Sequence, residues 1–333
     1  MTLTIFGAGA IGAYMAGKLA NAGVPVRLLA RPATAARLHA DGLIIEENGQ
    51  TLHLRAGELL TFQATKPVVL PCAREPVSPA DILLITVKSH QLLAALPDIA
   101  PFVGPRTLLA CLQNGIPWWY FHGLQGALAG RNLQCLDPEG RLSAALPLAR
   151  LLGGVIQKSA EQAAPGRIVA NPARGDAFLF GSPLPGLRPE GTEELLSALA
   201  SAGLNPRISD DIRRDVWIKL LGNAVFNPLS ALANADLAAM LAFPPARQLI
   251  RDGMAEVLAV ARAHGVSLDI SLDARLQRAE AVGAFRTSML QDKLKGRALE
   301  IDAILGGLLE LARLAQISVP HLETLYAATA LMR

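Results

Sequence analysis

Lys219, Asn223 and Asn227 are spaced four residues apart in a stretch otherwise built from apolar residues. On an α-helix, residues four positions apart lie on one stripe that drifts by about 40° per step. Polar side chains on a buried stripe need partners, and a bound substrate could be that partner. A lysine whose pKa is lowered by partial burial can protonate a developing alkoxide when hydride reaches a carbonyl carbon. We therefore interpret Lys219 as a candidate general acid.

The same spacing also has an interpretation without chemistry. Lys219 could lie along an amphipathic helix and extend its ammonium into solvent. Asn227 precedes Pro228, so the asparagine could cap a helix whose first residue is the proline. The spacing alone leaves both interpretations open, and other segments of the chain must decide between them.

A source of hydride is indicated at the start of the chain. A short β-branched run, Thr2–Phe6, leads into a glycine-rich turn and then into helix formers that stop at Gly23. A GxGxxG motif between strand and helix binds dinucleotides, because N–H groups at the helix N-terminus donate to the pyrophosphate. Gly7 would make the turn, Gly9 would admit the pyrophosphate and Gly12 would let helix and strand pack. Without the preceding strand and the following helix, the motif would be a mere glycine turn. The predicted cofactor contacts are Gly7, Ala8, Gly9, Ala10, Ile11 and Gly12.

The residue at the end of the second predicted strand indicates which dinucleotide is bound. An NAD site places Asp or Glu there to accept from the ribose 2′-hydroxyl, whereas this chain has Arg31. A guanidinium can instead pair with a 2′-phosphate, so NADPH/NADP+ is predicted over NAD. Lys88 follows another predicted strand at the sheet edge where such cofactors bind, and it is a second candidate contact. Both side chains could also be solvated surface residues.

Length and pattern predict an α/β protein of two domains. At 333 residues the chain exceeds the size at which single cores stop growing. Strands alternate with helices in the first part, which predicts an N-terminal Rossmann-type doubly wound sheet over 1–208. From about Asp210, Ala/Leu-rich helical periodicity replaces the strand patterns, which predicts a C-terminal all-helical domain over 209–333. The segment Arg131–Arg150 is predicted to be an irregular excursion between two strands.

The individual elements follow from the same patterns. The predicted strands are Thr2–Phe6, Pro25–Ala30, Ile82–Val87, Leu108–Leu112, Gly154–Gln157 and Ala177–Phe180, and the helices between them include Ala10–Ala22, Gln91–Leu96 and Glu193–Ala202. The aromatic run Trp118–Phe121 is expected to pack in a core or an interface.

Composition argues against several classes of partner. The 31 basic and 28 acidic residues give a net charge of +3 without a basic block, so nucleic acid is not expected as a partner. No signal sequence and no apolar run long enough to cross a bilayer is visible, so we expect a soluble, cytoplasmic protein without a membrane partner. Cys72, Cys111 and Cys135 form no CxxC pair, which favours a reducing compartment. The histidines show no metal-ligand spacing, and no metal is predicted.

Further segments resemble one protein family. Gln113-Asn114-Gly115 follows a predicted strand, Lys219–Pro228 reads KLLGNAVFNP, and Ser288–Asp292 reads SMLQD ahead of Glu300-Ile301-Asp302. With the glycine fingerprint, these segments resemble the ketopantoate reductase family (2-dehydropantoate 2-reductase) in order and spacing across nearly the whole chain. The KxxxNxxxNP and SMLQD patterns are specific to that family, whereas many dehydrogenases share the glycine motif.

The resemblance implies a reaction and a set of residues for it. The reaction is the NADPH-dependent reduction of 2-dehydropantoate to (R)-pantoate, a step of pantothenate biosynthesis, with Lys219 as the general acid. Glu300 would be catalytic, orienting the substrate hydroxyl and Lys219, and would also contact the cofactor. Asn114 would contact both the nicotinamide ribose and the substrate. The other substrate-binding residues that the resemblance implies are Asn223, Asn227 and Ser288.

Three of these residues also have simpler interpretations. Ser288 and Gln291 match a capping box, so Ser288 could simply begin a helix. Glu300 lies early in a predicted helix, where the helix dipole favours an acid. Asn114 and Gly115 could be no more than a turn.

The chain also departs from the family pattern. Phe285-Arg286-Thr287 stands where some members have an asparagine ahead of the serine, so the substrate could be another branched 2-oxo acid. A second alternative is a regulatory protein that binds NADPH without catalysing a reaction. The apolar helices predicted at Leu299–Leu314 and Pro320–Leu331 could form the seam of a homodimer.

Overall fold

The computed structural model describes residues 2–65, 78–171 and 175–332. Cys72 lies outside the described residues. The chain forms two compact units, and the predicted division into folding domains at residues 208 and 209 remains a proposal. Unit 1 comprises Met1–Gln113, His122–Gly130 and Gly140–Ile212, and unit 2 comprises Asn114–Phe121, Arg131–Glu139 and Arg213–Arg333.

Unit 1 is built on an eight-stranded sheet. Its strands are β1 (Leu3–Phe6), β2 (Val26–Ala30), β5 (Leu60–Ala64), β6 (Ile82–Ile85), β7 (Leu108–Cys111), β8 (Leu151–Gln157), β11 (Ala177–Gly181) and β12 (Pro206–Ile208). Their order is β12-β11-β8-β7-β6-β1-β2-β5, and all neighbours run parallel except β11 and β8. The strands from β5 to β8 therefore have the 3-2-1-4-5-6 order of a doubly wound sheet, which confirms the predicted α/β class.

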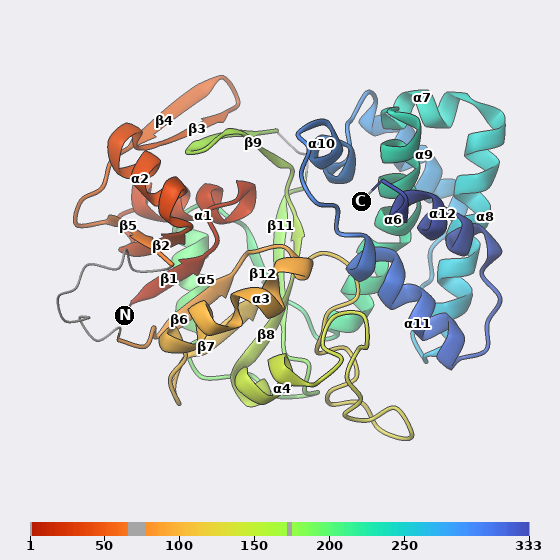
Figure 1. The fold of residues 1–333 in the computed structure, drawn as a ribbon, viewed down its shortest axis with the longest axis horizontal. Coiled ribbons are helices and arrows are strands. Elements are labelled where there is room, and N and C mark those ends of the chain that lie inside the picture. Colours follow the sequence, from red (N-terminus) through yellow and green to blue (C-terminus); the bar gives the residue numbers. More distant parts are fainter. Residues whose placement is uncertain (1, 66–77, 172–174, 333) are drawn as a thin grey trace. The chain divides into compact units, whose positions relative to one another are not determined.

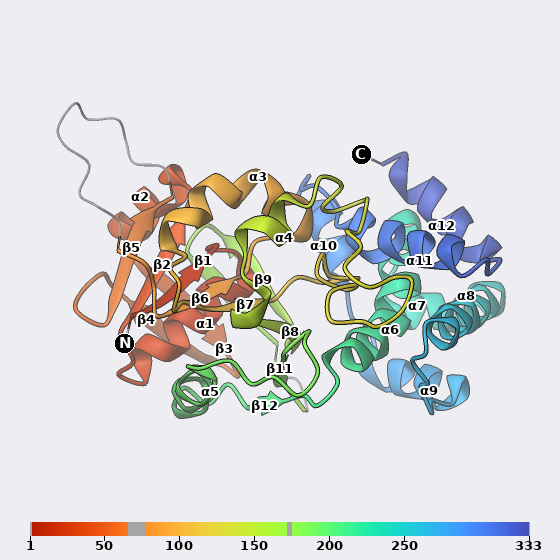
Figure 2. The same cartoon turned by 90° about the horizontal axis from the view of Figure 1, so that it is seen from below.

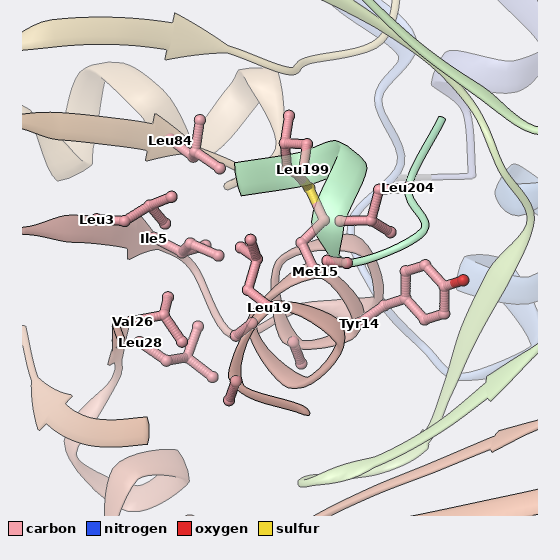
Figure 3. Packing of buried hydrophobic residues seen from close by; sticks show 14 of the residues in the cluster. Leu3, Ile5, Tyr14, Met15, Leu19, Val26, Leu28, Leu84, Leu199 and Leu204 are labelled. Carbon is pink, nitrogen blue, oxygen red and sulfur yellow. The ribbon is translucent and has the colours of Figure 1, made fainter. Parts of the chain in front are cut away.

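Helices cover both faces of this sheet. They are α1 (Ala10–Asn21), α2 (Pro32–Asp41), α3 (Ser89–Ile99), α4 (Arg141–Ala145) and α5 (Thr192–Ser201). Figure 2 shows α3 and α4 on one side of the strands and α1 and α5 on the other. On the α1 side, Met15, Leu19 and Leu199 pack with Leu3 and Ile5 in a core that excludes water (Figure 3). Because both faces are covered, β1, β6 and β7 are buried at every residue.

A second sheet of four strands lies outside the predicted elements. Its strands are β3 (Leu43–Glu47), β4 (Gln50–Leu54), β9 (Ala160–Ala164) and β10 (Arg167–Ala170), in the order β4-β3-β10-β9. Asn48 and Gly49 join β3 to β4 with φ angles of 52° and 74°, as a type I′ hairpin turn requires. The sheet contacts α1 through β3, β9 and β10. It therefore supports the helix that follows the glycine-rich turn.

From residue 213 onward, the described residues form helices and their connections, without a strand. Figure 1 shows these helices in green to blue, and they confirm the predicted helical region. Their bounds are α6 (Ile212–Ala233), α7 (Leu237–Ala242), α8 (Pro244–Ala263), α9 (Leu272–Val282), α10 (Ser288–Leu294), a π-helix (Asp302–Gly306), α11 (Gly307–Leu314) and α12 (Pro320–Ala330).

The long helix α6 forms part of the core of unit 2. It has the length and mean hydropathy of a membrane-spanning helix, but 67% of its most apolar window is buried within the structure. Trp217, Leu221 and Val225 are fully buried, and Gly253 of α8 packs closely against Val225. Burial against other helices therefore accounts for the apolar character of α6.

The excursion Arg131–Arg150 is confirmed between β7 and β8, although it also contains α4 and a short 3₁₀ turn. The aromatic residues of the run Trp118–Phe121 are each at most 2% exposed, so they pack in a core as expected. Both this run and residues 131–139 belong to unit 2, although the flanking strands belong to unit 1. Cys111 is buried and Cys135 is partly buried, and neither forms a disulfide bond among the described residues.

Candidate active site

The glycine-rich turn joins β1 to the N-terminus of α1 in unit 1. Gly9 is the N-cap residue of α1; no described side chain caps this end, and the first turn carries no acidic residue. Gly7 has a φ of 118°, which residues other than glycine rarely adopt. A Cβ on Gly12 would overlap the Gly7 carbonyl oxygen and Thr86 Oγ1, whereas a Cβ on Gly9 would have no neighbour within 4 Å. The close packing at Gly12, the space beside Gly9 and the uncapped helix end fit a dinucleotide pyrophosphate.

Two side chains that sequence reasoning missed hold this turn in place. Thr86 Oγ1 donates to the carbonyl oxygens of Phe6 and Gly7, at 3.1 and 2.8 Å. Gln162 Nε2, from β9, donates to the carbonyl oxygen of Ala8 at 3.0 Å. The position of Thr86 at the end of a predicted strand was a usable signal, whereas Gln162 belongs to a strand that the pattern does not reveal.

Arg31 and Lys88 lie at the strand ends where they were predicted. Arg31 follows β2 directly and is the exposed N-cap residue of α2. Lys88 is the N-cap residue of α3, and its backbone N–H donates to Gln91 Oε1 at 3.4 Å. Because β2 and β6 are the two neighbours of β1, both residues lie at the carboxyl edge of the sheet, on either side of the glycine-rich turn. Ligands of doubly wound sheets bind at this edge.

A partly buried polar network lies between α1 and the four-stranded sheet, and sequence reasoning missed it too. Lys158 Nζ donates to Glu47 Oε1 at 2.7 Å and to Asp176 Oδ2 at 2.6 Å, and the Lys158 side chain is 1% exposed. From α1, Tyr14 Oη and Lys18 Nζ donate to the same Glu47 carboxylate at 2.7 and 3.2 Å. The network ties α1 to the smaller sheet, and its members are too far apart in sequence to form a motif.

In unit 2, Lys219 is joined to two other predicted residues by hydrogen bonds. Lys219 Nζ donates to Asn114 Oδ1 at 2.6 Å, and Asn114 Nδ2 donates to Glu300 Oε2 at 3.3 Å. Glu300 is 8% exposed and lies directly before the helix that starts at Ile301, so the expectation that it lies within this helix is wrong. Asn114 therefore bridges the ammonium of Lys219 and the carboxylate of Glu300.

The segment Asn114–Phe121 is fixed to α6 by its aromatic end. Trp217 Nε1 donates to Tyr120 Oη at 2.9 Å, and Arg213 Nε donates to the Tyr120 carbonyl oxygen at 2.8 Å. Arg213 and Trp217 are four residues apart on α6, and Lys219 lies two residues after Trp217 on the same helix. These two contacts, which the sequence does not signal, hold the segment that brings Asn114 to Lys219.

The two asparagines of the predicted stripe follow Lys219 along α6, about 6 and 12 Å further along the helix axis. The helix continues through Pro228 to Ala233, so the interpretation of Asn227 as an N-cap is wrong. Asn227 is 5% exposed, and its Nδ2 has no hydrogen-bond partner among the described residues. Asn223, one turn earlier, is partly buried. A buried amide donor without a protein partner is the kind of group that a polar ligand satisfies.

Ser288 is exposed and is the first residue of α10. The N-cap is Thr287, whose Oγ1 accepts from the Leu290 backbone N–H at 3.2 Å, so the capping box predicted from Ser288 is wrong by one residue. Thr287 Oγ1 also forms a short hydrogen bond with Ser230 Oγ. Ser230 lies about one turn beyond Asn227 on α6, so this bond places Ser288 beside that helix. The N-cap of α10 does not use the Ser288 hydroxyl.

The surroundings of Lys219 change its acidity. Burial lowers the pKa of Lys219 from 10.5 to about 8, and the negative charge of Glu300 opposes this shift. An amine with this pKa is mostly protonated at neutral pH, yet it releases its proton more readily than an ordinary lysine does. Both properties suit a proton donor.

The pKa of Lys219 leads to an expected pH dependence of any reaction in which it donates a proton. The acid must carry its proton, so kcat/KM for the substrate should be constant below about pH 8 and fall about tenfold per pH unit above that value. The measurement is log kcat/KM against pH with saturating cofactor. A kcat/KM that stays level from about pH 7 to 10 would exclude Lys219 as the donor in the rate-limiting step.

The doubly wound sheet with its glycine-rich turn, together with a helical unit that holds a partly buried lysine, defines the class of the Rossmann-type oxidoreductases. The family model described as "Ketopantoate reductase PanE/ApbA" matches residues 3–182, and the model described as "Ketopantoate reductase PanE/ApbA C terminal" matches residues 211–333. The chain belongs to the ketopantoate reductase family.

Individual relatives agree with this assignment. A 2-dehydropantoate 2-reductase of Mesorhizobium japonicum is 39% identical over 328 residues, which cover 98% of this chain and 96% of the relative. The crystal structure of a 2-dehydropantoate 2-reductase from Geobacter metallireducens superposes with a TM-score of 0.81 at 28% identity, with each chain covered to 100%. D-mandelate dehydrogenase, solved with NADH and anilino(oxo)acetate, has the same fold with a TM-score of 0.82 at 21% identity, covering 100% of this chain and 98% of that one.

Proposed function

We propose that this protein catalyses the reduction of 2-dehydropantoate to (R)-pantoate by NADPH, a step of pantothenate biosynthesis in the cytoplasm. The observation that carries the proposal is the hydrogen-bonded chain of Lys219, Asn114 and Glu300 in a member of the ketopantoate reductase family. The Mesorhizobium japonicum relative, named for this reaction, supports the choice of substrate.

Lys219 is the proposed general acid. When bound, NADPH supplies a hydride to the keto carbon, and the former carbonyl oxygen then needs a proton. The Lys219 ammonium would give its proton to this oxygen, and Asn114 Oδ1, which accepts from Nζ at 2.6 Å, would fix the direction of the ammonium. The negative charge of Glu300 would keep Lys219 protonated and would orient the substrate hydroxyl.

The remaining proposed contacts divide between the two ligands. For the substrate, Ser288 would donate to the carboxylate, and Asn223 and the unpartnered amide of Asn227 would bind its polar groups. The cofactor pyrophosphate would lie at the α1 N-terminus, between Gly7 and Gly12. Lys88, Asn114 and Glu300 would make further cofactor contacts.

The test of the proposal is NADPH consumption by the purified protein with 2-dehydropantoate. We expect saturable turnover and formation of (R)-pantoate, identified by chiral chromatography. Tight NADPH binding without oxidation by any 2-oxo acid would instead support the regulatory alternative.

Arg31 is proposed to select NADPH by pairing with its 2′-phosphate. Because a charged hydrogen bond contributes about 1.5–3 kcal/mol, Arg31→Ala should raise the Kd for NADPH by about 10- to 100-fold and leave the Kd for NADH nearly unchanged. Arg37→Ala is the matched control, since Arg37 is also an exposed arginine, lies six residues after Arg31 on α2 and pairs with Asp41. Equal losses for the two cofactors, measured by fluorescence titration, would contradict the proposed role.

A second candidate substrate is another bulky 2-oxo acid. The fold is shared with D-mandelate dehydrogenase, whose structure holds anilino(oxo)acetate, and the sequence departs from the family pattern at Phe285 and Arg286. Comparison of kcat/KM for 2-dehydropantoate, phenylglyoxylate and 2-oxoisovalerate separates the candidates. We expect the highest kcat/KM for 2-dehydropantoate.

We further propose a homodimer that uses the apolar C-terminal helices. Leu331, at the end of α12, is 89% exposed, and burying such a side chain against a second copy is favourable. Light scattering at micromolar protein concentration would measure the oligomeric state. No nucleic acid, membrane or metal has a part in the proposed reaction.

A further inference from the structure

One turn of the helix after Glu300 is a π-helix, Asp302–Gly306. In this turn the Gly307 N–H donates to the carbonyl oxygen of Asp302, five residues earlier. In an α-helix the same N–H would donate to the carbonyl oxygen of Ala303, four residues earlier. The π-helical turn therefore releases the Ala303 carbonyl from the partner that regular helix geometry would give it.

The released carbonyl oxygen has a partner in another segment. Ile116 N–H donates to Ala303 O at 2.8 Å. Ile116 lies two residues after Asn114, so this bond fixes the backbone next to the side chain that bridges Lys219 and Glu300. The same π-helical turn begins two residues after Glu300, so it lies next to Glu300 as well as to the backbone that follows Asn114.

Gly115 makes this contact possible. A Cβ at position 115 would overlap the carbonyl group of Ala303 and lie 2.8 Å from the Ile304 nitrogen, and Gly115 has a φ of +84°. Any side chain would push the segment away from the π-helical turn. The Asn114-Gly115 pair is a turn, as its simpler interpretation expected, but the turn is also the point of closest approach between the two segments.

We infer that the π-helical turn Asp302–Gly306 is a positioning device for the reaction, in which the Ala303 carbonyl and Gly115 hold Asn114 between Lys219 and Glu300. The inference rests on the proposed reductase function. Gly115 is a positioning residue, because it acts only through Asn114. π-Helical turns often occur at functional sites, and here the altered hydrogen-bond pattern supplies a specific reason.

The test is Gly115→Ala, compared with Gly265→Ala. Gly265 also lies in unit 2 and has a φ of +77°, but a Cβ there has no neighbour within 4 Å. The control therefore carries the same backbone strain without the collision. Activity is expressed per NADPH-binding site, determined by titration, so that unfolded molecules do not count.

For Gly115→Ala we expect kcat to fall by about 10- to 100-fold, with smaller changes in KM and in the Kd for NADPH, because the reacting groups are misaligned and not lost. Gly265→Ala should keep kcat within about twofold. A merely structural role of Gly115 would lower the number of NADPH-binding sites and leave kcat per site unchanged. A kcat equal to that of the control would overturn the inference.

A second variant removes only the donor of the hydrogen bond. Replacing the Ile116 amide by an ester, with the α-hydroxy analogue of isoleucine introduced by nonsense suppression, keeps the side chain and deletes the N–H. We expect kcat to fall by about tenfold, and a kcat equal to that of the wild type would overturn the inference even if Gly115→Ala does not fold. A wild type without reductase activity would defeat the proposed function itself, whereas an active wild type with fully active variants would defeat only the positioning role.

Discussion

Lys219→Ala is expected to keep its fold, to bind NADPH and to lose about 10²- to 10⁴-fold in kcat, the usual contribution of a general acid. The Nζ atom of Lys219 donates a hydrogen bond to Asn114 Oδ1, and burial lowers its pKa to about 8. Without the amine, the alkoxide oxygen would have to take its proton from water. Stopped-flow measurement of NADPH oxidation gives kcat, and fluorescence titration gives the Kd for NADPH.

Two further variants separate proton donation from charge and from packing. Lys219→Arg keeps a positive charge but cannot release a proton near neutral pH, so it should lose nearly as much activity as Lys219→Ala. Lys219→Met fills the space of the partly buried lysine, which avoids the loss of stability that a cavity would cause. A Lys219→Ala enzyme that keeps kcat within tenfold of the wild type, while folded and loaded with NADPH, would remove the general-acid role.

The second large effect is expected at the glycine-rich turn, where the substitution of two different glycines should have different consequences. Gly9→Ala places a methyl group in open space, so the free protein should keep its Tm, while the Kd for NADPH rises by about 10- to 100-fold. Gly12→Ala would push its methyl group into the Gly7 carbonyl and Thr86. We therefore expect Gly12→Ala to cost about 1–3 kcal/mol of unfolding free energy as well as NADPH affinity.

Gly23→Ala is the control for these two variants. Gly23 follows the same helix, with a φ of +81° and no neighbour within 4 Å of a Cβ, so its substitution should cost about 1 kcal/mol of stability and no NADPH affinity. Thermal unfolding and NADPH titration of the three variants measure both effects. If Gly9→Ala binds NADPH as tightly as the wild type, the pyrophosphate does not lie beside Gly9 and the proposed cofactor site is wrong.

The elements of the large sheet could be predicted because their signals are local. The apolar runs that became β1, β2, β6 and β7 are largely buried on both faces, and a glycine or proline lies within a few residues of at least one end of each run. The four-stranded sheet lacks such runs, because its strands are partly exposed and polar. One signal was nevertheless present: Asn48-Gly49 between two runs of β-branched and apolar residues indicates a hairpin.

The candidate site could be predicted only in part. The i, i+4, i+8 spacing placed Lys219, Asn223 and Asn227 on one helix, and the structure bears this out. The partners of Lys219 came from the family resemblance, because a hydrogen bond between residues 114 and 300 leaves no trace in composition or periodicity. The π-helical turn was beyond prediction for a similar reason: the carbonyl oxygen of Ala303 accepts from the Ile116 N–H, which belongs to a distant segment.

The excursions of residues 114–121 and 131–139 into unit 2 affect how the gene can be divided. The chain passes from one unit to the other after residues 113, 121, 130, 139 and 212, so no single cut yields two complete fragments. A C-terminal fragment starting at 209 would lack Asn114 and the buried aromatic residues that cover α6. Insertions, fusions and circular permutations are therefore better placed at exposed turns within one unit than at the apparent midpoint of the sequence.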